Sequence, residues 1–242
     1  MHGHETTRCE RSRSRAVTPL IPIRDTIPSK RFPLVTILII VVTVVVFLFE
    51  LSLGESRETF IRTFGLTPAQ VQIDASYHAY GWVVIPFITT IFLHGGWLHL
   101  LGNMLYLWIF GDNVEDKLGH GRFFVFYLLC GITGSVLHAT MNPESPIPTI
   151  GASGAIAGVL GSYFLLFPKS KVVTLVPIFL FFTFVEIPAG LFLGFWFLMQ
   201  FLYGTLSFAN ETSVNSGGVA WWAHVGGFAS GMILVFPFRK YR

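Results

Sequence analysis

Long stretches without a charged residue constrain this chain more than any other feature of its sequence. Only 12% of its 242 residues are charged, and the mean hydropathy is +0.64. A soluble domain carries about 25% charged residues. The charges are also clustered, which leaves several apolar segments long enough to cross a bilayer. The sequence therefore predicts an all-α, polytopic membrane protein.

Six segments are predicted to cross the bilayer or nearly cross it. They are residues 33–53, 97–111, 123–140, 153–168, 187–208 and 219–238. Residues 1–31 are polar and basic, and we expect a disordered tail. Residues 32–242 are expected to form a single membrane domain, whose first span is an uncleaved anchor because no small-residue cleavage site follows it.

The long loop between the first two spans, residues 54–96, is not purely polar. Its segment 82–93 is apolar but too short to span, and Pro86 interrupts it. This pattern indicates an interfacial or re-entrant element.

The placement of Lys and Arg predicts the orientation of the bundle. With six spans, fourteen of the sixteen basic residues lie in the N-terminal tail, the second and fourth loops and the C-terminus. The other two, Arg57 and Arg62, lie in the first loop. The positive-inside rule then places both termini in the cytoplasm.

Four polar residues are predicted to lie at one depth in this bundle. They are His99, Asn103, Ser153 and His224, each within about the first seven residues of a span that enters from outside. At about 1.5 Å per residue, all four lie within about 10 Å of the outer end. Polar groups inside spans are costly and usually functional.

Small residues predict how two of these spans meet. Gly154 and Gly158 on the fourth span, and Ala223, Gly227 and Gly231 on the sixth, are spaced four apart. Such faces let helix backbones approach closely, which would bring the Ser153 hydroxyl within hydrogen-bond reach of His224. The preceding segment, MNPESPIPTIGA, contains three prolines, so the fourth helix should begin below the surface, beside a water-filled cavity.

These residue types predict a nucleophile and its base. A serine needs a base to become nucleophilic, and His224 could supply it. The outer halves of the spans that carry the four polar residues contain no Asp or Glu, so a dyad is expected in place of a triad. His99, Asn103 and the N–H groups that begin the fourth span could stabilise an oxyanion.

Simpler interpretations exist for each polar group. Taken alone, a Gly-Ala-Ser-Gly segment is more often a packing motif, and Asn103 could hydrogen-bond across helices. Five other polar residues are expected only to form hydrogen bonds in loops or at helix ends. They are His94, His120, His138, Glu186 and Gln200.

Three motifs carry a resemblance to a known family. GASGAIAGVLGSY (151–163), AHVGGFASG (223–231) and HGGWLHLLGNMLYLWIFGDNVED (94–116) resemble the motifs of rhomboid intramembrane serine proteases, and the opening IPIRDTIPSKRFPLVT is similar to that of many bacterial members. The resemblance implies Ser153 as nucleophile, His224 as base, and His99 and Asn103 as oxyanion donors.

The resemblance also implies partners and location. It implies transmembrane protein substrates cut near the membrane boundary, the lipid bilayer as surroundings, no metal, cofactor or nucleic acid, and a bacterial inner membrane. Some members carry an aromatic residue packed on the histidine where this chain has Ala157, so we expect an aromatic from another helix. The substrate and the oligomeric state are left open.

Two alternatives belong to other functional classes. One is a protease-dead rhomboid-like protein that only binds transmembrane helices, against which the intact Ser, His and Asn set argues. The other is a channel or transporter, which would more often show paired repeats, and no such symmetry is visible.

Overall fold

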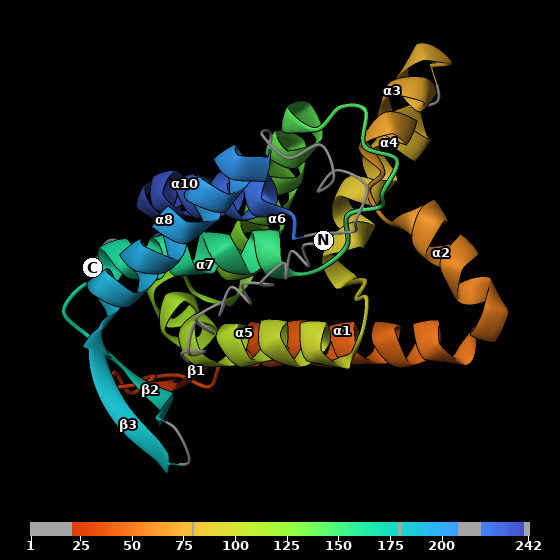
Figure 1. Cartoon of the computed structure of the whole chain (residues 1–242). Coiled ribbons are helices and arrows are strands. Elements are labelled where there is room, and N and C mark those ends of the chain that lie inside the picture. The colour runs from red at the N-terminus through yellow and green to blue at the C-terminus, as the bar shows by residue number, and fades with distance from the viewer. Residues whose placement is uncertain (1–20, 79, 179–180, 208–218, 240–242) are drawn as a thin grey trace, which may run out of the picture.

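The protein is a bundle of helices with a small sheet at one end (Figure 1). The computed structural model describes residues 21–78, 80–178, 181–207 and 219–239. Six helices correspond to the six predicted spans, with ends mostly within three residues of those expected. They are α1 (Leu34–Ser52), α5 (Trp97–Leu118), α6 (His120–Met141), α7 (Ser153–Leu166), α8 (Ala189–Ser207) and α10 (Trp221–Phe238). The predicted helical membrane bundle is confirmed, and α5 runs two turns beyond its predicted end.

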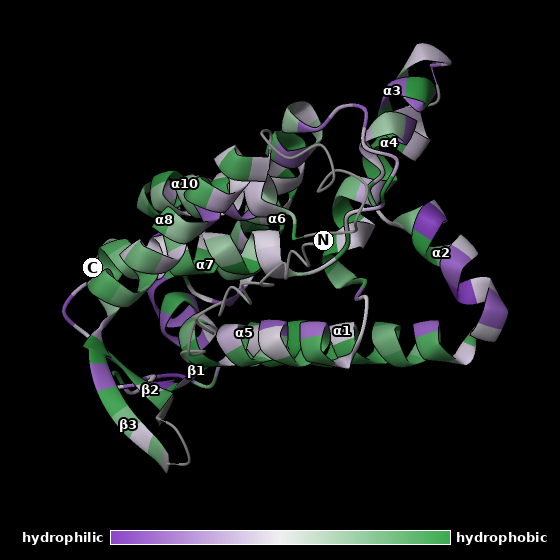
Figure 2. Ribbon diagram, viewed as in Figure 1, coloured by the Kyte–Doolittle hydropathy of each residue, from purple (hydrophilic) through white to green (hydrophobic). Residues whose placement is uncertain are grey.

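Apolar length differs among these helices. Among the described residues, α1, α6, α8 and α10 are each long and apolar enough to cross a membrane. Helix α5 meets that test together with the helical segment before it, from which it is bent by 81°. Helix α7 has 14 residues, about 21 Å, which is shorter than a hydrocarbon core of about 30 Å. Figure 2 shows α1, α8 and α10 as mainly hydrophobic.

The long first loop is helical over much of its length. It contains α2 (Arg57–Phe64), α3 (Pro68–Ser76) and α4 (Tyr80–Thr89), with short 3₁₀ turns η1 (Gly54–Ser56) and η2 (Thr90–Phe92). Pro86 lies inside α4. The sharp bend between α4 and α5 agrees with the interfacial or re-entrant element predicted for residues 82–93.

A three-stranded antiparallel sheet was not predicted. Strands β1 (Ile21–Asp25), β2 (Lys171–Ile178) and β3 (Phe181–Pro188) pair in that order, with Ile21 opposite Leu175 and Lys171 opposite Pro188. Residues 21–25 therefore belong to the folded structure, which corrects the expectation that the disordered tail extends to residue 31. Residues 1–20 lie outside the described part, and the division into tail and membrane domain stays a prediction.

One buried carboxylate fixes the start of α1. Glu115, near the end of α5, accepts hydrogen bonds from the backbone N–H groups of Val35 (2.9 Å) and Thr36 (2.8 Å), and from the Thr36 hydroxyl (2.7 Å). These amides would otherwise lack partners, because the first N–H groups of a helix have none within it. His120 also contacts Glu115, at 2.5 Å, which agrees with the helix-end role expected for it.

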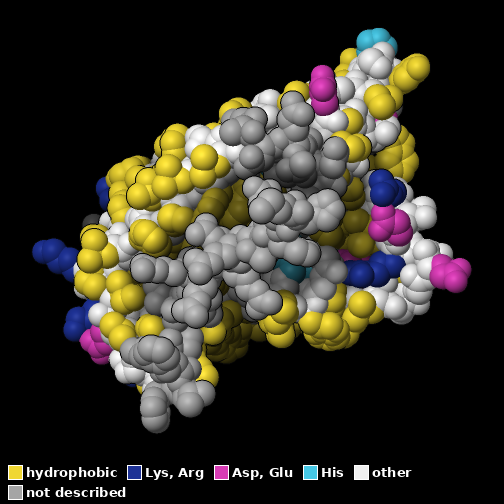
Figure 3. Space-filling model, in the orientation of Figure 1, with side chains coloured by type: hydrophobic (Ala, Val, Ile, Leu, Met, Phe, Trp, Pro, Cys, Tyr) yellow, Lys and Arg dark blue, Asp and Glu magenta, His cyan; other side chains and the backbone are white. Residues whose placement is uncertain are grey.

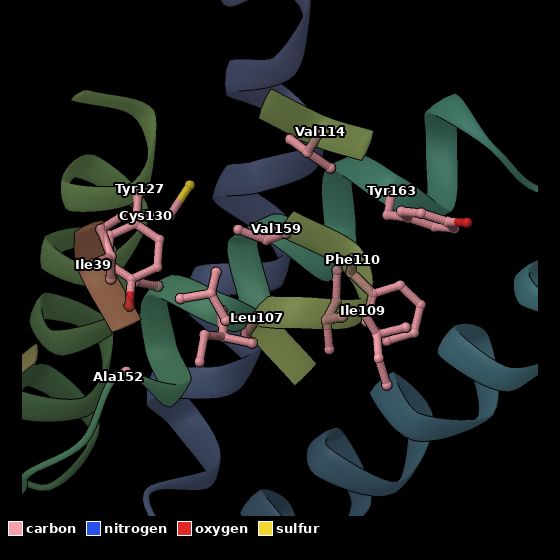
Figure 4. Packing of buried hydrophobic residues seen from close by; sticks show 14 of the residues in the cluster. Ile39, Leu107, Ile109, Phe110, Val114, Tyr127, Cys130, Ala152, Val159 and Tyr163 are labelled. Carbon is pink, nitrogen blue, oxygen red and sulfur yellow. The ribbon is translucent and has the colours of Figure 1, made fainter. Parts of the chain in front are cut away.

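The core lies between α5, α6 and α7 (Figure 4). Phe110, Tyr127 and Tyr163 are fully buried there, and the Phe110 and Tyr163 rings meet edge to face at 5.0 Å. Helix α10 packs most extensively on α7 and α6, whereas α8 packs on α10 along one side. In Figure 3 hydrophobic side chains cover the flanks of the bundle, and charged side chains gather toward its two ends.

Candidate active site

Ser153 is the first residue of α7, and the backbone two residues before it has a conformation that favours glycine. Gly151 has φ of +130°, a conformation that L side chains rarely adopt. Its N–H donates to the Thr90 carbonyl at 2.9 Å, and Thr149 pairs with Leu66 as an isolated β-bridge. These bonds hold the approach to Ser153 against the first loop.

Backbone contact between α7 and α10 brings Ser153 to His224. A Cβ atom added at Gly227 would lie 1.9 Å from the Gly154 carbonyl oxygen, and one at Gly231 would lie 2.0 Å from that of Gly158. Only glycine allows the helices to touch in this way. The Ser153 Oγ lies 2.8 Å from His224 Nε2, so the predicted hydrogen bond is present in the structure.

The other side of His224 faces α8. Its Nδ1 lies 2.7 Å from the Gln200 Oε1, and both side chains are buried, with exposed fractions of 8% for His224 and 7% for Gln200. The Trp196 ring lies 5.7 Å from the imidazole at an interplanar angle of 33°. Trp196 is thus the aromatic from another helix that was expected in view of Ala157.

His99 and Asn103 flank the backbone before Ser153. A Cβ atom added at Gly151 would lie 2.7 Å from His99 Nε2 and 3.6 Å from Asn103 Nδ2. Asn103 is buried and its Nδ2 lies 3.0 Å from His94 Nε2. The amide of Asn103 must donate to this nitrogen, which leaves its second N–H for another acceptor.

His94 has a larger part in the site than expected. It is fully buried, and its backbone N–H donates to Glu50 at 3.2 Å. Arg57 donates to the His94 carbonyl at 2.9 Å and pairs with Glu50 at 3.5 Å. These contacts position the imidazole that orients Asn103. His94 therefore supports the site in addition to forming the loop hydrogen bond that was expected of it.

A cavity of about 820 Å³ connects these groups. Ser153, His224, His99 and Asn103 all line it. His138 lines it too, and its buried Nδ1 has no hydrogen-bond partner among the described residues, which contradicts the simple helix-end bond expected there. The structure therefore gathers the four predicted residues at one cavity, while their catalytic roles stay predictions.

Comparison with known proteins identifies the family. The model of the Rhomboid domain matches residues 81–241, which include all four predicted residues. The chain belongs to the rhomboid family. This family includes intramembrane proteases, and this member is an integral membrane protein.

Several relatives carry the word protease or rhomboid in their names. The chain is 38% identical to rhomboid protease GluP of Bacillus subtilis over 116 residues, 48% of this chain and 21% of that protein. It is 32% identical to the mitochondrial Rhomboid protein 1 of Saccharomyces cerevisiae over 153 residues, 62% of this chain and 40% of the relative. It is 31% identical to RHOMBOID-like protein 1 of Arabidopsis thaliana over 166 residues, 69% of this chain and 37% of the relative. The chain thus matches well under half the length of these relatives.

The sequence analysis expected only an ordinary hydrogen bond from Gln200 and did not name Trp196, although a signal existed for both. Gln200 is a polar residue inside an apolar span, and such residues are usually functional. Trp196 precedes it by four residues and so shares its helix face. Glu186, in contrast, pairs with Lys171 at 2.8 Å in the sheet, away from the cavity.

Proposed function

We propose that this protein is an intramembrane serine endopeptidase. It cleaves transmembrane segments near the membrane boundary at which α7 begins, by a Ser153–His224 dyad. The observation that carries the proposal is the 2.8 Å contact between Ser153 Oγ and His224 Nε2, at a cavity that His99 and Asn103 also line. Membership of a family with named proteases supports the same chemistry.

The first step follows from the roles of the two groups. His224 Nε2 takes the proton from the Ser153 hydroxyl as Oγ attacks the carbonyl carbon of the scissile amide. His224 then gives this proton to the leaving amine, and an acyl-enzyme remains on Ser153. A water molecule in the cavity, deprotonated by the same nitrogen, hydrolyses the ester and restores the serine.

Oxyanion stabilisation falls to groups around Gly151. Asn103 has a free N–H, His99 lies on the same helix face one turn earlier, and the N–H groups at the start of α7 lack helical partners. Donors held in place before charge develops stabilise the transition state without reorganisation. These three kinds of donor support a site for the tetrahedral intermediate.

Location and orientation are part of the proposal. The basic residues Lys117, Arg122 and Lys169 lie at the helix ends opposite Ser153, whereas Arg57 and Arg62 lie in the first loop. The positive-inside rule then puts the sheet and both termini in the cytoplasm, with the cavity open to the other side. The resemblance of residues 21–36 to bacterial members supports a bacterial inner membrane. A single cysteine at Ser145 should react with an impermeant thiol reagent in intact cells. A cysteine at Lys169 should not react, and its labelling from outside would indicate that the orientation is the opposite one.

The activity test compares Ser153→Ala with wild type on a purified transmembrane substrate in lipid vesicles. We expect cleavage to disappear in Ser153→Ala and in His224→Ala. Ser162→Ala is the matched control, because Ser162 lies on the same helix and bonds only its own backbone, to the Val159 carbonyl at 2.8 Å. Substrate that binds to wild type without being cleaved would favour the protease-dead alternative, and cleavage by Ser153→Ala would refute the dyad.

A further inference from the structure

We propose that Gln200 of α8 is a positioning residue for His224, and that it takes the place that a carboxylate holds in a Ser-His-Asp triad. This inference rests on the proposed protease function. It adds a third member, from a third helix, to a pair otherwise supplied by α7 and α10.

The hydrogen bond to Gln200 determines which nitrogen of His224 carries a proton. The side-chain carbonyl of Gln200 can only accept, so the Nδ1 atom 2.7 Å away must donate. A neutral imidazole with its proton on Nδ1 leaves the Nε2 lone pair free. That lone pair faces the Ser153 hydroxyl at 2.8 Å, as a general base requires. Gln200 therefore selects the tautomer that can deprotonate serine.

Because His224 is buried, its Nδ1 depends on Gln200 for a hydrogen bond. The imidazole and the amide are both buried, and no other acceptor for Nδ1 occurs among the described residues. Leaving a buried N–H without an acceptor is unfavourable, because the group has also lost its hydrogen bonds to water. With the amide oxygen toward the ring, as in the structure, the alternative tautomer would leave two acceptors facing each other, so it requires the Gln200 amide to rotate and donate through its Nε2.

A neutral partner suits the surroundings better than a carboxylate would. Gln200 lies in the middle of an apolar helix, where an ionised side chain would carry a large desolvation cost. An amide orients the ring through one hydrogen bond and adds no net charge. It stabilises the imidazolium less than a carboxylate would, so its contribution should be orientation and tautomer selection more than charge stabilisation.

Trp196 reinforces the same arrangement. It lies one helical turn before Gln200, so both side chains project from one face of α8 toward His224. The indole beside the ring limits rotation of the imidazole about its side-chain bonds. Helix α8 thus determines which nitrogen of His224 carries the proton and how the plane of its ring is oriented.

The test compares two substitutions at Gln200 with one control on the same helix. Gln200→Met keeps size and removes the acceptor, Gln200→Glu keeps the acceptor, and Thr205→Val is the control, since the Thr205 hydroxyl bonds the Leu202 carbonyl of its own helix. We expect Gln200→Met to lower kcat about 10- to 100-fold, the range found for loss of a group that orients a functional histidine, with KM unchanged. Gln200→Glu should recover most of the rate and move the acid limb of its pH profile upward, because a carboxylate favours the imidazolium.

Two results of the activity assay would overturn the proposal. One is a Gln200→Met enzyme with wild-type kcat and pH profile. The other is equal loss of activity in Gln200→Met and Gln200→Glu with a lowered melting temperature, which would indicate packing alone. Nitrogen NMR of His224, assigned by difference from His224→Ala, provides a readout that needs no turnover. Wild type should show a protonated Nδ1 and Gln200→Met a mixture of tautomers, and a protonated Nε2 in wild type would refute the inference even if the protein proves inactive.

Discussion

The contact between α7 and α10 and the contact between α8 and α10 reach the same histidine by different means. At the first, backbones touch, and a Cβ atom at Gly161 would lie 2.1 Å from the Phe228 carbonyl oxygen. At the second, side chains mediate the contact, and a Cβ atom at Gly204 of α8 would lie 3.2 Å from the Trp222 ring of α10. The difference teaches that the contact between Ser153 and His224 is set by rigid backbone packing, whereas the orientation of the His224 ring depends on replaceable side chains.

Disturbing the backbone contact should have the largest effect. Gly227→Ala places a methyl group 1.9 Å from the Gly154 carbonyl, so α7 and α10 must separate. Overpacking typically costs about 1–3 kcal/mol, or several degrees in melting temperature. We expect activity to fall more than about 100-fold, because small displacements of reacting groups are costly. Thermal unfolding and cleavage assays in detergent measure both effects.

Gly194→Ala is the control for that prediction. It makes the same chemical change on α8, where space exists, and should leave activity and stability near wild type. If both glycine variants behaved alike, the losses in Gly227→Ala could not be assigned to the backbone contact between α7 and α10, and that contact would not be what sets the Ser153–His224 geometry.

Asn103 tests a donor that side chains hold in place. Asn103→Ala should lower kcat by up to about 10²–10³, the usual result of losing one oxyanion donor, and other donors would reduce the loss. KM should change little, because the interaction strengthens in the transition state. Steady-state kinetics on a transmembrane peptide separate the two constants, and unchanged kcat in both Asn103→Ala and His99→Ala would remove the oxyanion assignment.

Removing the Trp196 ring should slow turnover less than removing Asn103. An aromatic contact of this kind contributes about 0.5–1.5 kcal/mol, so Trp196→Ala should slow turnover about 2- to 10-fold. Trp196→Phe should restore most of the rate, because a ring remains against His224. Trp108→Ala is a matched control on the exposed side of α5. Equal losses in both alanine variants would point to general destabilisation.

The smallest expected effect lies at the far end of the bundle, where Asp25 links a side chain of α5 to one of α7. Asp25 of β1 accepts hydrogen bonds from Tyr163 (2.5 Å) and Asn113 (2.9 Å). Burial raises the pKa of Asp25 above its usual value of 3.8, although the bond from Tyr163 opposes this shift. The folded state therefore holds the proton more tightly than the unfolded state does.

A raised pKa predicts the sign of the pH dependence. The stability that Asp25 contributes is fully present below pH 3.8 and is lost as the pH rises through the folded pKa. Wild type should thus gain melting temperature relative to Asp25→Asn when the pH falls from 7 to 4, by no more than about 2–4 °C. Asp74→Asn, on α3, is the control. If the melting temperature of wild type fell relative to that of Asp25→Asn as the pH decreased to 4, the raised pKa of Asp25 would be contradicted.

The sequence predicted the helices well because hydrophobic length is a local property. The bounds of α1, α7 and α10 follow from apolar segments, and spaced glycines indicated which helices touch. The sheet could not be predicted in this way, because β1 pairs with residues about 150 positions away and its strands are short segments inside apparent loops. Gln200 and His94 were underestimated because their roles depend on how α8 and the first loop are turned, which no local pattern contains.

The pairing of β1 with β2 also has a consequence for biogenesis. Between them the chain passes through α1, α5, α6 and α7, and strands can pair only if an even number of crossings returns them to the same side. At a synthesis rate of about 5–20 residues per second, β1 emerges roughly 8–30 s before its partner strand. During that interval α1 is in the membrane while the edge of β1 has no neighbour. Closure of the sheet is therefore a late event, which can occur only after the helix bearing Ser153 has been made and inserted.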